Sequence, residues 1–117
     1  MEPIFDRGGR TVGWVRDDRV MNRAGQHVAF VSNSSIVDYA GRHRGVFSNG
    51  FIRDHAGHAV AFTRGAHGGP LTPLAELPPL APLPPLAPLK PLASLAPLPG
   101  LPSLGWSPLS WERFLGY

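Results

Sequence analysis

Residues 4–67 consist of four copies of a sixteen-residue repeat, with no insertion between the copies. Each copy opens with a branched apolar residue, at Ile4, Val20, Ile36 and Ile52. Asp or Asn stands two positions later and Gly three positions after that, which gives eight predicted turn residues: Asp6, Gly9, Asn22, Gly25, Asp38, Gly41, Asp54 and Gly57. A unit this short cannot bury its own apolar face, so the four copies must pack together.

Each copy predicts two short strands. Asp or Asn followed by Gly suits a type I turn closed by a left-handed residue, because Gly adopts a positive φ without steric cost. A second turn signal follows each longer run, and Asn49-Gly50 is the strongest of these because it favours a type I′ hairpin. A propeller blade would need about 40 to 50 residues. The repeats therefore predict an all-β fold, a shallow closed barrel of four pseudo-symmetric hairpins, since closure removes exposed sheet edges.

Alternation along the longer strands predicts which residues share a face. Val12 and Trp14 should point one way, and Gly13 and Val15 the other. Small and large residues follow one another in every copy: Gly13-Trp14, Ala29-Phe30, Gly45-Val46 and Ala61-Phe62. The small residues suit a crowded position near a four-fold axis. Both faces carry apolar groups, so one should form the core and something else should cover the other.

This pattern resembles the four-fold beta-flower family. The rows Ile4–Trp14 and Phe51–Gly57 carry the likeness, which covers about residues 3–69, and the proline-rich tail is also typical of the family. The resemblance implies a shallow barrel of four hairpin petals and supplies no catalytic residues. A likeness in shape to Tubby-like domains implies lipid binding by analogy alone. The family symmetry is broken at Arg44, Arg53 and Thr63, which predicts one petal edge facing solvent.

A second segment, residues 70–105, has a period of three. From Leu71 to Leu104 every third residue is leucine, with proline at many positions between. Polyproline II has three residues per turn, so the twelve leucines should form one stripe on a rod of roughly 105 Å. Such a stripe must pack on its own domain, on copies of itself or on a partner. Because a small barrel cannot contact the whole rod, we expect part of the stripe to pack on the barrel and the rest to pack elsewhere.

The third segment, residues 106–117, is aromatic. Ser110 followed by Trp-Glu-Arg-Phe-Leu predicts one capped helical turn. Trp106, Trp111 and Phe114 favour an anchor that fills a groove of the same molecule; docking to a partner or a membrane interface is the alternative.

Signals for chemistry are weak along the whole chain. Cysteine is absent, which excludes a disulfide framework and a thiolate nucleophile. The sequence shows no nucleophile elbow, phosphate loop or catalytic carboxylate pair. His55 and His58 straddle a turn and read as surface histidines. The Asp/Asn column that starts at Asp6 could ring a hard cation, but turn capping explains the same residues. The sequence therefore predicts no enzyme, no cofactor and no metal site.

Two functions remain open. The first is a non-enzymatic interaction or assembly module, in which the polyproline segment contacts a protein partner or another copy. Aromatic residues that suit polyproline ligands are Trp14, Phe30 and Phe62. The second is a peripheral membrane module that places arginines from Arg7 to Arg64 on anionic lipid and the aromatics of residues 106–117 at the interface.

Charge and hydropathy limit the location and the partner. The formal net charge of +3 is too small to indicate nucleic-acid binding. The N-terminus lacks a basic region followed by an apolar run, and proline interrupts the leucine-rich tail. The sequence predicts a cytoplasmic protein, with peripheral membrane association as the alternative.

Overall fold

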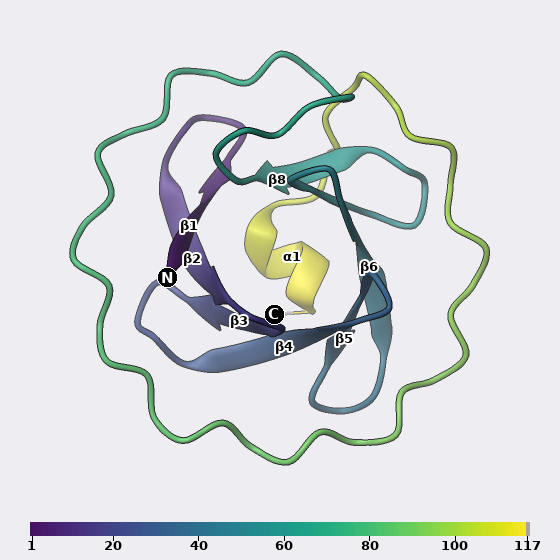
Figure 1. The fold of residues 1–117 in the computed structure, drawn as a ribbon. Helices are drawn as coiled ribbons and strands as arrows, with labels where there is room; N and C mark the ends of the chain where they lie inside the picture. Colours follow the sequence, from purple (N-terminus) through teal and green to yellow (C-terminus); the bar gives the residue numbers. More distant parts are fainter. Residues whose placement is uncertain (117) are drawn as a thin grey trace.

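A computed structural model describes residues 1–116. Within them, eight strands form a closed antiparallel barrel in chain order, and the last strand pairs with the first (Figure 1). The elements are β1 (Glu2–Asp6), β2 (Thr11–Arg16), β3 (Arg19–Asn22), β4 (His27–Ser32), β5 (Ser35–Asp38), β6 (His43–Ser48), β7 (Phe51–Arg53), β8 (Ala59–Phe62) and α1 (Trp111–Leu115). The predicted meander and its closure into a ring are confirmed.

The two ends of the barrel use different turns. At the end that carries α1, the Gly9 N–H donates to the Asp6 carbonyl at 2.9 Å, and Asp6 Oδ1 accepts from the N–H groups of Gly8 and Arg10. The turns that begin at Asn22, Asp38 and Asp54 have the same backbone bond. At the opposite end, φ is positive at both residues of Asn33-Ser34 and Asn49-Gly50, as type I′ hairpins require.

Every repeat carries a β-bulge at the same position. Ile4 lies opposite Gly13, but Phe5 lies opposite Thr11, so Val12 is the extra residue. The equivalent bulged residues are Val28, Arg44 and Val60. A bulge reverses the alternation of side chains on one side of it. The prediction that Val12 shares a face with Trp14 is therefore wrong: Val12 packs against the interior cluster, to which Trp14 does not belong.

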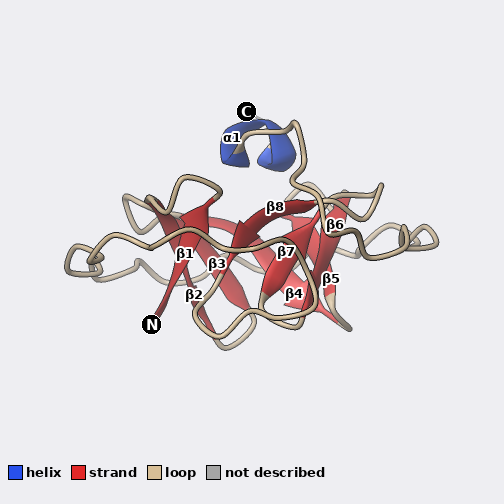
Figure 2. Cartoon of the chain, turned by 90° about the horizontal axis from the view of Figure 1, so that it is seen from above, coloured by secondary structure: helices blue, strands red, loops and turns tan. Residues whose placement is uncertain are grey.

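The barrel interior is closed at one end by the C-terminal helix (Figure 2). The first-strand column is buried as predicted, and Trp111, Phe114 and Leu115 join the same cluster. A Cβ added at Gly45 would collide with the Arg53 carbonyl oxygen and would lie 2.7 Å from the Phe114 ring, so the neighbouring strand and α1 leave no room for a side chain there. Ser110 caps α1 by accepting from the Arg113 N–H at 3.2 Å. The aromatic side chains of α1 thus pack within their own molecule, and the anchor expected over residues 106–117 stays a prediction whose last residue lies outside the described part of the chain.

The residues that break the four-fold symmetry do not form a solvent-facing edge, so that prediction is wrong. Arg53 and Thr63 are only 3% and 2% exposed. The Arg53 guanidinium donates to the carbonyls of Gly57, Ser103 and Gly68 at 2.7 to 3.0 Å, and burial lowers its pKa. Arg44 pairs with Asp38 at 2.8 Å. Two of the acceptors of Arg53 come from beyond the repeats, which is why the repeats alone pointed to solvent.

Candidate functional site: a leucine belt around the barrel

Residues 70–105 run once around the outside of the barrel as an extended chain, and we call them the leucine belt (Figure 1). They contain no helix or strand. The belt leaves the barrel after β8, returns beside its own start, and then turns inward to α1 (Figure 1). Its path explains the dimensions of the molecule, a disc of 36 × 35 × 23 Å.

The belt is attached to the barrel once in every nine residues. At the first, third and fourth petals, the N–H groups of Glu76, Ser94 and Ser103 donate to the carbonyls of turn glycines: Gly9 at 2.8 Å, Gly41 at 2.8 Å and Gly57 at 3.1 Å. At the second petal the belt residue is Pro85, which has no N–H, and its carbonyl lies 2.8 Å from His27 Nε2. Nine residues of the belt therefore span the distance between equivalent points of two successive sixteen-residue repeats of the barrel.

Both charged side chains of the belt contact the barrel. Glu76 Oε1 accepts from the Thr11 N–H at 2.7 Å, and that hydrogen bond lowers the pKa of Glu76. Lys90 pairs with Asp18, whose pKa it lowers, and lies 5.5 Å from the Phe30 ring centroid. Glu76 and Lys90 are the two charged residues of the belt, so both of its charges are engaged by the barrel.

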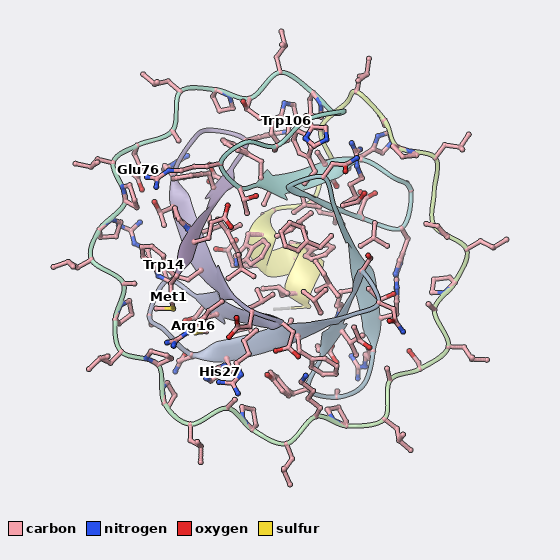
Figure 3. The ribbon with its side chains drawn as sticks, in the orientation of Figure 1. Met1, Trp14, Arg16, His27, Glu76 and Trp106 are labelled. Atoms are coloured by element: carbon pink, nitrogen blue, oxygen red, sulfur yellow. The ribbon has the colours of Figure 1, made fainter. Side chains whose placement is uncertain are left out.

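The leucines all face outward (Figure 3). Leu71 to Leu104 are 77% to 98% exposed, whereas the half-buried residues of the belt include Ala75, Pro82 and Ala87. The expectation that part of the leucine stripe packs on the barrel is wrong. The inward side is instead fixed by backbone hydrogen bonds and by small or proline residues, which allow closer approach than leucine does.

The aromatic residues singled out in the sequence lie inside the fold rather than on its surface. Phe62 packs against Phe5 and Trp106, with ring centroids 5.4 Å and 6.1 Å apart. Trp14 and Phe30 are buried, and Trp111 and Phe114 fill the barrel mouth. Trp14 and Trp106 lie between the strands and the belt (Figure 3). A role for these six residues in binding a partner stays a prediction, and in this conformation they hold the chain's own segments together.

Sequence reasoning missed the residues that attach the belt. Their signal was present: Glu76, Pro85, Ser94 and Ser103 are nine residues apart, and three of them are polar within an apolar segment. A period of nine combined with a period of three gives three leucines for each of four petals.

The chain matches the 4-fold beta flower protein family over residues 2–115. It belongs to that family. No curated protein and no solved structure gives a significant match. Because the family match extends through the belt and α1, both are parts of the beta-flower unit rather than additions to it. No helix within residues 1–116 is long and apolar enough to cross a membrane.

Turn glycines of the beta-flower meet two demands at once. Gly25 and Gly41 have φ of 85° and 86°. A Cβ at Gly25 would lie 2.8 Å from Pro82 Cγ, and one at Gly41 would lie 2.7 Å from the Leu92 carbonyl oxygen. The turn conformation and the approach of the belt therefore both require the absence of a side chain.

We expect Gly41→Val to lower the free energy of unfolding by about 1–3 kcal/mol, from backbone strain, with a further loss from the displaced belt. Urea denaturation measures this change. Gly65→Val is the matched control, because Gly65 also has a positive φ but no neighbour within 4 Å of an added Cβ. Equal losses in the two variants would contradict the close approach of the belt at Gly41.

Two histidines from different petals of the beta-flower form a pair. His43 Nδ1 lies 2.9 Å from His55 Nε2, and His43 Nε2 lies 3.0 Å from Ser35 Oγ. His55 therefore contacts His43 rather than forming a paired site with His58. Burial, and after it the proximity of His55, lowers the pKa of His43.

This pair predicts a loss of stability in mild acid. The folded-state pKa of His43 lies below its ordinary value of 6.5, so the unfolded chain binds the proton more readily. Stability should fall as the pH drops from about 7.5 to about 5.5, a range in which carboxylates with lowered pKa values stay ionised. Urea midpoints at the two pH values measure the change. His43→Gln should bring the urea midpoints at the two pH values closer together. An unchanged difference between them would contradict the assignment of the pH effect to His43.

The Asp/Asn column belongs to four separate turns. Oδ1 of Asp38 accepts from the N–H groups of Ala40 and Arg42, and Oδ1 of Asp54 accepts from those of Ala56 and His58. In the described part of the chain, no three His, Asp or Glu side chains lie close enough together to hold a metal ion. Turn capping, the interpretation favoured from the sequence, accounts for these hydrogen bonds.

Proposed function

We propose that this beta-flower protein is a non-enzymatic interaction module whose contact surface is the leucine belt. The supporting observation is the continuous ring of twelve outward leucines, each at least 77% exposed. At about 100 Å² of apolar surface for each leucine, the ring exposes about 1,200 Å². The largest apolar patch on a typical monomer is about 300–600 Å², and larger patches mark interaction sites.

The chemistry of the belt favours an apolar partner. Its two charged side chains, Glu76 and Lys90, are engaged by the barrel. Ser94 Oγ accepts from the His43 N–H at 3.3 Å. The rim is therefore aliphatic, and recognition depends on shape and burial rather than on ion pairs.

A peripheral membrane role receives less support. Trp111 and Phe114, which the membrane alternative would place at the interface, are buried in the barrel mouth. Because the ring surrounds the barrel, a flat bilayer could cover all of it only if one end of the barrel were immersed in the membrane. Both ends carry charged turns, with Asp6 and Arg10 at the α1 end and Asp17 and Arg19 at the other. Burying charged side chains in hydrocarbon is costly.

The test removes one leucine from each petal. We expect the quadruple change to glutamine at Leu71, Leu80, Leu89 and Leu98 to reduce binding of an apolar fluorescent dye and retention on a phenyl matrix. Because the four side chains are exposed, the melting temperature should change little. The same four changes to methionine are the control and should preserve binding. Unchanged dye binding in the glutamine variant would contradict the proposal, and flotation with anionic vesicles would favour the membrane alternative.

A further inference from the structure

We propose that the partner of the belt is other copies of this chain, which meet edge to edge in the plane of the disc. The inference rests on the proposed function and specifies its partner. The attachment points divide the belt into four edges of three leucines each. The edges are Leu77, Leu80, Leu83; Leu86, Leu89, Leu92; Leu95, Leu98, Leu101; and Leu104, Leu71, Leu74, the last formed where the two ends of the belt lie side by side (Figure 1).

Each edge is complementary to a copy of itself. Leucines three residues apart form a regular row, and two such rows can interdigitate about a two-fold axis. Glu76 and Lys90 are held by contacts with the barrel, so neither charge lies in a row of leucines, where it would repel an identical row. The rim also offers no outward ion pair or aromatic anchor of the kind that typically specifies an unrelated protein.

The shape of the disc and the apolar area of each edge determine how copies can associate. The disc is nearly circular, 36 by 35 Å, so two convex rims can meet along one edge at a time. Three leucines from each copy bury about 600 Å² in total, at about 100 Å² for each leucine. A stable pair usually needs about 1,200 Å² or more. A single edge is therefore a weak contact, and three further edges remain free on each copy. We infer an open assembly that grows with concentration rather than a closed dimer.

Sedimentation velocity of the full chain over a wide concentration range tests this inference. The intact protein should show a mass that rises continuously with concentration. Changing the leucines of two opposite edges, 77/80/83 and 95/98/101, to glutamine should limit growth to linear chains. Changing a third edge, 86/89/92, should leave monomers and dimers. The same positions changed to methionine should assemble like the intact protein, and circular dichroism confirms that each variant is folded.

Two results separate this inference from the proposed function. An intact chain that stays monomeric or forms only a closed dimer, yet binds the apolar dye through the belt, would overturn edge-to-edge assembly and leave the interaction module standing. An intact chain that neither assembles nor binds the dye would overturn both. Should a glutamine variant unfold, the concentration series of the intact chain still decides between open assembly and a fixed mass.

Discussion

A chain truncated after Gly69 is expected to lose its stable fold. Truncation removes Trp111, Phe114 and Leu115 from the interior cluster. Each of these side chains contributes about 1.5–3 kcal/mol when buried, and the whole stability of a small domain is about 5–15 kcal/mol. The same truncation uncovers Phe5 and Phe62 on the outer face, which pack against each other and Trp106. Near-UV circular dichroism and thermal unfolding of the truncated chain measure the effect.

A second truncation separates the effect of losing the helix from the effect of losing the belt. A chain that ends at Gly105 keeps the belt and its attachments at Glu76, Ser94 and Ser103 but lacks the helix that closes the barrel. We expect it to be more stable than the chain that ends at Gly69 and less stable than the full chain. A Gly69 truncation that unfolds at the temperature of the full chain would contradict this account of the tail.

Deleting Ala81 is the second change with a large expected effect. The deletion leaves eight positions where nine link the attachments at Glu76 and Pro85. The following attachments at Ser94 and Ser103 must then shift or break, and the later leucines rotate by a third of a turn if the segment has polyproline II periodicity. We expect a loss of several kcal/mol, which lowers the melting temperature by about 10 °C or more for a chain of this size. Differential scanning calorimetry measures it.

Two controls distinguish the phase of the leucines from the spacing of the attachments. Ala81→Ser keeps both and should change the melting temperature little. Deleting residues 81–83 keeps the leucines in phase but shortens the link to Pro85, so it should also be destabilising. If the three-residue deletion were harmless while the one-residue deletion was not, the leucine phase alone would matter, and the nine-residue attachment would be refuted.

The sequence predicts the barrel well because equivalent positions of the four repeats must meet the same structural requirements. Gly at the sixth position of each repeat, as at Gly9, marks a positive φ, and the branched apolar residue at the first position marks the core. The bulge at Val12 was not predictable from alternation, because valine suits either face and the extra residue leaves no compositional trace. Its repetition at Val28, Arg44 and Val60 shows that the bulge belongs to the repeat.

The direction of the belt was harder to predict than its periodicity. A leucine stripe normally indicates a buried face, so the leucines were expected to pack partly on the barrel. The inward face is set by long-range hydrogen bonds, such as that from the Ser94 N–H to the Gly41 carbonyl, which a local pattern cannot report. The burial of Arg53 has the same origin, because two of its carbonyl acceptors lie at Ser103 and Gly68.

Amide hydrogen exchange in the belt, measured by NMR at a concentration where the chain is monomeric, tests whether the belt is held against its own barrel. We expect the N–H groups of Glu76, Ser94 and Ser103, which bond to the barrel, to exchange about tenfold or more slowly than those of Leu77 and Leu95 beside them. That pattern, with a period of nine, requires a belt held by its own barrel with its leucines turned outward. Uniformly fast exchange throughout residues 70–105 would contradict it.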